Sequence, residues 1–539
     1  MTAPAPLELG DALEGLVGQF ADPWSFLREL VQNAIDAGSL EIDVNHDHDP
    51  DAGMMTIEFV DNGEGMDREI IDTRLTRLFS SAKDGDYTKI GRFGIGFVSV
   101  FAIEPELVCV DTARAGEHWR ILFRKDRTFE RILLDHPGEG TTVRIFLRRD
   151  EVGYEDARAR ILATLRYWCR HAHVDLRIDG ESVSEVLTVD SPCVVHHEEE
   201  GTAVVVGLWP EAGAPRGYYH GGLTLHEEVG GEGAIPYLAF KIDSRFLEHT
   251  LTRDNVLRDE NYAKALAIVE RVASGALIVE VVRLLGELAL CERGTRDPRR
   301  VALLCGALSR HLAAGSELSD ECRGAPVIPT LGGAPLSLAA CAAQGEALRC
   351  DRVRSPVTDT LASQGLPVLD CAEGEPLYGL IEAAVGIRAK AANAALCFAC
   401  AAPDAAADGR WHQLANAVRA LLLADGIKLR GIAIGDLSYP GSPVADRIAI
   451  SQGELGELTP IDEVGTLGSG LFSGGRYVVL NAGHSVLKNL LEGGRAAAEP
   501  ELSAYLIVKL LYLRVELSPE RDGRLASRAM EGRCRRLTS

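Results

Sequence analysis

The hydrophobic and polar positions of the first 150 residues change between helical and strand-like spacing. Apolar residues recur every three to four positions over 24–37, which predicts a helix with Asp22 as its N-cap and Pro23 at its first position. Residues 54–60 alternate, which predicts a strand that ends in a turn at 61–66. Further helices are predicted at 67–82 and 97–103, and further strands at 107–112, 119–125 and 141–147. This pattern predicts an α/β (α+β two-layer sandwich) domain over residues 1–152.

The rest of the chain predicts two further α/β regions. Residues 153–292 are expected to form a smaller middle domain, and a charged stretch around Pro298 marks its end. Residues 293–539 follow as a C-terminal region of one or two subdomains, with no chemical motif of its own. The elements expected in these regions are strands at 173–178, 202–208 and 236–242, a helical tract from 260, a hairpin at 325–337, alanine-rich helices to about 425, strands at 427–435 and 476–480, and helices at 485–492 and from 501.

Composition and charge narrow the class of protein. The 539 residues carry a net charge of −23, which argues against a protein that binds nucleic acid nonspecifically through a basic face. No apolar run is long enough to predict a membrane span, and the N-terminus lacks the pattern of a secretory signal, so a cytoplasmic protein is expected. The twelve cysteines form no framework, and the single C-x-x-C of Cys397 and Cys400 favours buried thiols over a metal or redox site.

A polar stripe lies on the first predicted helix. Glu29, Asn33 and Asp36 follow one another at helical spacing, beside an apolar stripe that would face a core. An asparagine oxygen suits magnesium, and a carboxylate one turn away can act as a general base. Taken alone, the stripe is more typical of a solvated helix face.

Three further segments carry candidate chemistry. Asp61 ends a predicted strand, where its carboxylate can accept a hydrogen bond from an exocyclic amine, although Asp-Asn-Gly is also a common turn. Three glycines over 91–96 lead into an apolar helix start, and exposed amides at such a start bind phosphate. The sequence contains no P-loop motif. Thr141 opens a strand and offers a hydroxyl, which alone favours an ordinary strand residue.

The four segments in order resemble a known family. FLRELVQNAIDAG, DNGEGM, IGRFGIGFVSVF and GTTVRIFL look like the successive ATP-site motifs of the GHKL ATPases with a Bergerat fold, and most of all those of the heat-shock protein 90 (HtpG-type) chaperones. The third motif separates these chaperones from MutL and gyrase. The resemblance implies ATP and Mg²⁺ as ligands.

The resemblance also implies a role for each matching residue. Glu29 would activate the attacking water, and Asn33 would hold magnesium and phosphate. Arg92 stands where the chaperones carry glutamine. The other matches are Asp36 on the polar helix face, Asp61 for the adenine amine, Gly65 and Met66 for the floor of the base pocket, Lys83 for the lid, Gly94, Gly96 and Phe97 for the phosphate-side turn, and Thr141 for the pocket threonine.

A fainter similarity covers 235–262. There Thr252-Arg253-Asp254 matches the catalytic loop of the chaperone middle domain, so Arg253 would reach the γ-phosphate; a surface salt bridge is the alternative. The function expected is ATP binding and slow hydrolysis that couples lid and domain closure to chaperone-like remodelling. The alternative is a non-chaperone GHKL ATPase switch in signalling or defence. In both cases the C-terminal half would contact a client or partner, and a homodimer is an analogy to the family.

Overall fold

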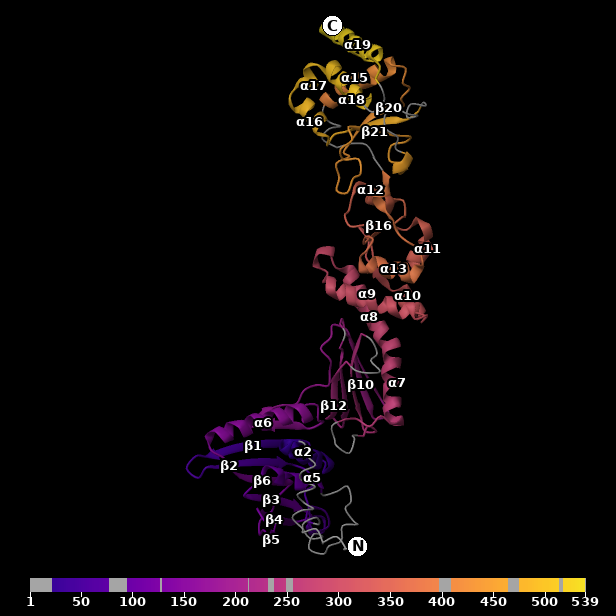
Figure 1. The fold of residues 1–539 in the computed structure, drawn as a ribbon. Coiled ribbons are helices and arrows are strands. Elements are labelled where there is room, and N and C mark those ends of the chain that lie inside the picture. The colour runs from indigo at the N-terminus through magenta and orange to yellow at the C-terminus, as the bar shows by residue number, and fades with distance from the viewer. Residues whose placement is uncertain are drawn as a thin grey trace, which may run out of the picture. The chain divides into compact units, whose positions relative to one another are not determined.

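The computed structural model describes residues 22–76, 95–126, 128–211, 213–230, 237–248, 255–396, 409–463, 475–512 and 517–538. By its internal contacts the chain divides into two compact units, Met1–Leu277 and Ile278–Ser539. Figure 1 shows the order of the elements along the chain. No helix within the described ranges is long and apolar enough to span a lipid bilayer.

An eight-stranded sheet forms the base of the first unit. Its strand order is β5-β4-β3-β6-β2-β1-β7-β8, and every neighbouring pair is antiparallel except β1 and β7. The strands are β1 (Glu41–Asp49), β2 (Met54–Asp61), β3 (Leu107–Arg114), β4 (Glu117–Arg124), β5 (Phe129–Leu133), β6 (Thr141–Arg148), β7 (Asp175–Ile178) and β8 (Glu181–Ser182). The strands predicted at 54–60, 107–112, 119–125 and 141–147 are thereby confirmed as β2, β3, β4 and β6.

Helices pack on this sheet through its apolar residues. They are the 3₁₀ helix η1 (Pro23–Ser25), α2 (Phe26–Asp36), α3 (Arg68–Ile70), the π-helical η2 (Ile71–Leu75), α5 (Ile95–Val98), the 3₁₀ helix η4 (Ser99–Ile103) and α6 (Glu151–Cys169). Asp22 caps η1 by accepting a hydrogen bond from the backbone N–H of Trp24 at 3.0 Å, so the predicted cap is confirmed one turn before α2. Leu27 and Val31 of α2 share one core with Ile57 of β2.

This core extends past the boundary expected at residue 152. Ile161 and Leu165 of α6 are fully buried in it, and Leu176 of β7 joins them. The stretch predicted as a middle-domain strand at 173–178 instead pairs with β1, with Ile42 opposite Leu176. Helix α6 thus leads the chain back to β7, which pairs with β1, so residues 151–178 belong to the first sheet and its core. Local spacing in the sequence does not reveal such a long-range strand pairing.

A second sheet completes the first unit. Its strands are β9 (Val194–Glu199), β10 (Thr202–Leu208), β11 (Pro215–His220), β12 (Leu223–Val229) and β13 (Leu238–Ser244), in the order β12-β11-β13-β10-β9. Helix α7 (Glu260–Ser274) contacts β10 and β13, and α8 (Ala276–Leu290) follows it. The predicted strand at 202–208 and the helical tract from 260 are confirmed.

The first part of the second unit holds a small parallel sheet. Its order is β17-β16-β18, with β16 (Arg349–Asp351) between β17 (Val368–Asp370) and β18 (Lys390–Ala391). The predicted hairpin at 325–337 is confirmed as β14 (Pro326–Ile328) paired with β15 (Leu336–Ser337). The other elements are η5 (Arg293–Thr295), α9 (Pro298–Ala313), α10 (Asp320–Gly324), α11 (Leu338–Gln344), η6 (Gly345–Ala347), α12 (Pro356–Ser363), α13 (Pro376–Val385), η7 (Ala392–Ala394) and β19 (Ala395–Leu396).

The rest of the second unit forms a separate helical core. Its elements are α15 (Gly409–Ala424), β20 (Gly431–Gly435), β21 (Ala449–Gln452), β22 (Thr459–Pro460), η8 (Ile461–Glu463), β23 (Tyr477–Asn481), α16 (Ser485–Glu492), α17 (Arg495–Ala498), α18 (Pro500–Tyr512) and α19 (Pro519–Thr538). The predicted strands near 427–435 and 476–480 are confirmed as β20 and β23, which pair in parallel. The helices expected at 485–492 and from 501 are confirmed as α16 and α18. The alanine-rich helices expected to about 425 are present as α11, α12, α13 and α15, and the strands β16, β17 and β18 between them were not predicted.

Candidate nucleotide-binding site

One row of polar residues crosses the apolar face of the first sheet. Asp61 is paired with Thr141, and Thr141 with Thr112, across β2, β6 and β3. In β2 every second residue from Met55 is buried, and Asp61 continues that series. Since side chains two residues apart lie on the same face of a strand, Asp61 shares the face of Ile57 and Phe59, which belong to the core under the helices. A polar row in this position faces the helices rather than bulk solvent.

The hydroxyl groups of this row are connected. Thr112 is 1% exposed, and its Oγ1 lies 3.0 Å from Oγ1 of Thr141. The same Thr112 oxygen accepts a hydrogen bond from the backbone N–H of Met66 at 2.9 Å. The sequence analysis did not single out Thr112, because a lone threonine in a strand carries no motif and only its register with Thr141 reveals it. Thr112 thus fixes the end of the 61–66 turn to the sheet.

The turn itself requires its glycine and asparagine. Gly65 has a φ of +66°, and a Cβ there would overlap the carbonyl oxygen of Ala113, so only glycine fits. Oδ1 of Asn62 accepts hydrogen bonds from the backbone N–H groups of Leu40 and Glu41 at 2.9 and 3.0 Å. The turn is therefore held against the chain that leads from α2 into β1. Asp61 stands at the fixed end of this turn.

The Asp61 carboxylate is buried. Asp61 is 8% exposed, and no arginine or lysine in the described ranges forms an ion pair with its carboxylate. Burial raises the pKa of Asp61, and hydrogen bonds from the backbone N–H groups of Gly63 and Thr141 oppose that rise. A carboxylate has about four lone-pair positions, so this one can accept a further hydrogen bond from a ligand.

Helix α2 carries the second group of candidate residues. Glu29 is buried at 9% exposure, while Asn33 and Asp36 are exposed. Nε2 of Gln32 donates a hydrogen bond to Oδ1 of Asp36 at 3.1 Å. The expected polar stripe therefore runs from the buried Glu29 carboxylate to the exposed Asn33 amide. The Asp36 carboxylate accepts a hydrogen bond from its own helix.

Helix α5 approaches α2 at the Glu29 carboxylate. A Cβ built on Gly96 would lie 2.6 Å from Oε2 of Glu29, so a larger residue at 96 would displace that carboxylate. The ring of Phe97, one residue on, is buried against Phe123 with centroids 5.3 Å apart. Phe97 thus anchors α5 to the sheet, and Gly96 leaves the space next to Glu29.

A cavity of about 660 Å³ is lined by Asp61 and by the turn residues 62–64 that follow it. Neither Glu29 nor Asn33 lines it. Besides Asp61, five of its lining residues are acidic, namely Glu41, Asp43, Glu64, Glu117 and Glu139. Like charges at this density repel a polyphosphate, so the cavity does not suit the phosphate end of a nucleotide.

Comparisons with known proteins agree with this geometry. The family model described as "Histidine kinase-, DNA gyrase B-, and HSP90-like ATPase" matches residues 21–130. The chaperone protein HtpG of Anaplasma phagocytophilum is 37% identical over 162 residues, which are 24% of this chain and 25% of that protein. HtpG of Nitrosospira multiformis is 37% identical over 161 residues, which are 23% of this chain and 24% of that protein.

The N-terminal part of this chain is an HtpG-like GHKL ATPase domain. The whole chain spans about a quarter of the length of the curated relatives it matches. The α/β fold class predicted from the sequence is confirmed. A GHKL domain of this kind implies ATP binding.

The GHKL domain contains most of the residues that the sequence analysis selected. Glu29, Asn33, Asp61, Gly96 and Thr141 lie on α2, β2, α5 and β6, and their roles toward a nucleotide stay predictions. Others fall outside the described residues, namely Lys83, Arg92, Gly94, Thr252, Arg253 and Asp254. The described ranges hold no group of three or more His, Cys, Asp or Glu residues that could bind a metal ion.

Proposed function

We propose that the GHKL domain binds ATP through Asp61 and hydrolyses it slowly with Glu29 as general base. The observation that carries this proposal is the buried Asp61 carboxylate at the end of a turn that only glycine permits. This carboxylate has spare acceptor capacity, and no cation among the described residues pairs with it. A carboxylate in this state suits an exocyclic amine, because the amine supplies the hydrogen bond that burial has withheld. Thr141 and Met66 border the same position and complete the base pocket.

The phosphate side of the proposal rests on α2 and α5. Asn33 presents a side-chain amide oxygen one turn from Glu29, where it would hold Mg²⁺ together with the phosphates. A bound magnesium ion neutralises phosphate charge. Glu29 is buried beside Gly96, and a carboxylate shielded from bulk water is well placed to remove a proton from an attacking water.

The coupling of hydrolysis to remodelling is the finer part of the proposal. The matched relatives are named chaperones, and we propose a chaperone-like cycle in which Arg253 contacts the γ-phosphate when the domains close. A client, contacted through the C-terminal half, and a homodimer belong to the same proposal. The second candidate is an ATPase switch in signalling or defence. It is favoured because the similarity to the HtpG chaperones extends over only about a quarter of this chain.

Phosphate release from ATP by the full chain tests the proposal. The wild type should turn over, and Glu29→Gln should lose about 10²- to 10⁴-fold in rate while nucleotide affinity stays the same. Gln32→Glu, a matched change on the neighbouring face of α2, should keep wild-type turnover. Equal rates for wild type and Glu29→Gln would remove Glu29 from the mechanism. Suppression of client aggregation by the wild type would favour the chaperone over the switch.

A further inference from the structure

The small parallel sheet of the second unit brings the ends of three strands to one edge. The chain runs from β16 through α12 to β17 on one side of β16, and then through α13 to β18 on its other side. Both neighbours are parallel to β16, so the carboxyl ends of all three strands lie at the same edge. In open parallel sheets, ligands bind outside these ends, where the winding of the chain reverses.

A cavity of about 360 Å³ lies at this edge. Each of the three strands contributes to its lining, through Asp351 and Arg352 at the end of β16, Glu373 after β17 and Asn393 after β18. Ligand pockets usually measure about 300–1,000 Å³, and this cavity is near the lower limit of that range. Its size therefore suits a small metabolite rather than a nucleotide or a peptide segment.

The buried part of the lining carries no charge. Cys350, Tyr378 and Ala389 line the cavity and are 5%, 7% and 7% exposed. The Tyr378 hydroxyl donates a hydrogen bond to the carbonyl oxygen of Ala389 at 3.2 Å, so it is already used within the protein. Ala372 and Ala391 add two small apolar side chains. This part of the cavity suits an apolar group of a ligand, whose orientation the polar lining residues would then set.

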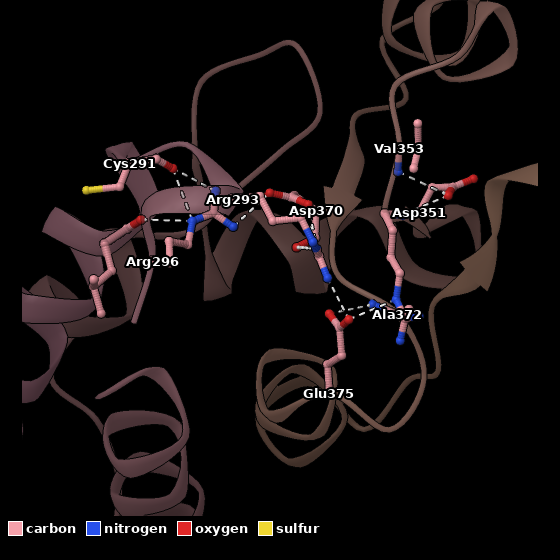
Figure 2. A network of polar contacts seen from close by, with 10 residues as sticks. Cys291, Arg293, Arg296, Asp351, Val353, Asp370, Ala372 and Glu375 are labelled. Carbon is pink, nitrogen blue, oxygen red and sulfur yellow. Dashed lines mark hydrogen bonds and ion pairs between the residues drawn. The ribbon is translucent and has the colours of Figure 1, made fainter. Parts of the chain in front are cut away.

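An ionic network holds the arginine of the lining in place (Figure 2). Nε of Arg352 donates a hydrogen bond to Oε1 of Glu375 at 2.9 Å, and Arg293 donates to the same oxygen at 2.5 Å. Asp370, the last residue of β17, accepts hydrogen bonds from Arg293 and Arg296, each at 2.7 Å. The two terminal nitrogens of Arg352 have no hydrogen-bond partner in the described part of the chain. This edge of the guanidinium can therefore donate two hydrogen bonds to a carboxylate.

Two carboxylates of the lining can accept further hydrogen bonds. Oδ1 of Asp351 accepts from the backbone N–H of Arg352 at 2.7 Å, and a carboxylate offers about four acceptor positions. Neither Asp351 nor Glu373 forms an ion pair with a lysine or arginine of the described ranges. Two such negative charges at one cavity attract an ammonium group and repel a simple anion. Because Arg352 lines the same cavity, the charges of the lining match a ligand that carries an ammonium group and a carboxylate together.

We propose that the cavity at the carboxyl edge of β16 binds a free α-amino acid with an apolar side chain. The ligand's ammonium group donates to Asp351 and Glu373, and its carboxylate accepts from the terminal nitrogens of Arg352. Its side chain contacts Tyr378 and the alanine residues of the lining. An amine without a carboxylate leaves Arg352 without a partner, and an acid without an amino group faces two carboxylates. The site lies wholly within the second unit and does not depend on the nucleotide site.

Equilibrium dialysis of the full chain against radiolabelled L-alanine, L-valine and L-leucine tests the proposal. At least one of the three should bind. The tightest of them is then displaced with two unlabelled analogues of the same shape, the amine that lacks its carboxylate and the acid that lacks its amino group. Each analogue should bind at least about tenfold more weakly, because each loses charge-assisted hydrogen bonds. No binding of any of the three amino acids would overturn the proposal, and so would an amine or an acid that binds as tightly as the amino acid.

Single substitutions then assign the two ends of the ligand. Arg352→Ala and Asp351→Asn should each weaken binding of the amino acid by about 10- to 150-fold. Arg352→Ala should also remove the preference for the amino acid over its amine, whereas Asp351→Asn should keep that preference. Arg354→Ala is the matched control and should bind like the wild type, since the Arg354 side chain is 64% exposed against 58% for Arg352, pairs with Asp359 and does not line the cavity. Wild-type affinity in either cavity variant, or an equal loss in Arg354→Ala, would contradict the site.

Discussion

Asp61 of the first unit and Asp370 of the second are buried to a similar extent, at 8% and 4% exposure. Their partners differ. Among the described residues, Asp61 accepts hydrogen bonds from backbone N–H groups, whereas Asp370 accepts hydrogen bonds from two guanidinium groups at 2.7 Å. The first carboxylate has capacity for a ligand, and the second is committed to joining η5 and the residue after it to β17. Burial by itself therefore does not mark a binding residue. The two carboxylates differ in whether a cation from the described part of the chain pairs with them.

The largest effect is expected at Asp370. Asp370→Asn removes the charge that pairs with Arg296, whose side chain is only 10% exposed, and leaves a buried cation without its carboxylate. Loss of one partner of a buried ion pair costs about 3–5 kcal/mol. Urea unfolding of the full chain should show this loss, with nucleotide affinity unchanged. A wild-type unfolding curve would mean that the network is not structural.

The reverse pattern is expected at Asp61. Asp61→Asn should lose a charge-assisted hydrogen bond to adenine of about 1.5–3 kcal/mol, or roughly 10- to 150-fold in ATP affinity. Folding stability should be kept, because the substitution leaves no cation of the described ranges without its partner, and a neutral amide costs less to bury than a carboxylate. Calorimetric titration and urea unfolding of the same variant measure both quantities. A variant that unfolds early yet binds ATP normally would place Asp61 in the same class as Asp370.

A smaller effect is expected at Thr112. Thr112→Val keeps the shape of the side chain but leaves the N–H of Met66 without its acceptor, at a cost of about 1–3 kcal/mol in folding stability. Thr142→Val is the matched control, since Thr142 lies on the opposite face of β6. Thr112→Val should unfold at a lower midpoint temperature than Thr142→Val. Equal midpoint temperatures would show that Thr112 does not hold the 61–66 turn to the sheet.

The smallest effect is a pH dependence. Binding needs the ionised Asp61, whose pKa is raised by burial, so ATP affinity is full above that pKa and falls as the pH drops through it. The folding stability of the nucleotide-free protein depends on pH in the opposite direction. A raised carboxyl pKa adds stability at low pH, and this contribution is lost as the pH rises through that pKa. Titrations of the wild type and Asp61→Asn across the acid range test this. The slope of ATP affinity against pH should differ between the two proteins. Equal slopes would mean that another group causes the pH dependence.

The elements that could be predicted from the sequence are those whose residues form a local pattern of hydrophobic, polar and glycine positions. The helix at 24–37, the strand at 54–60 and the glycine turn at 61–66 that follows this strand are all predicted from spacing and composition. Strand β1 was not predicted, because its sequence EIDVNHDHD is mostly polar and becomes a strand through its pairing with β2 and β7. Strands β16 and β17 have three residues each, too few to show alternation.

The candidate site follows the same rule. Glu29, Asn33 and Asp61 belong to continuous motifs, so the sequence identified them together. Thr112 joins them only through the register of β3 with β6. Contacts between distant segments carry no sequence pattern, which is why the structure was needed to find Thr112.

A calorimetric comparison of two nucleotides tests the central claim most directly. Inosine triphosphate has an oxygen where adenine has its exocyclic amine, and this oxygen would face the Asp61 carboxylate as a second acceptor. With magnesium present, the wild type should bind ATP and bind inosine triphosphate at least about tenfold more weakly, as expected for one lost charge-assisted hydrogen bond. Equal affinities, or no heat from ATP, would contradict the assignment of Asp61 and with it the site.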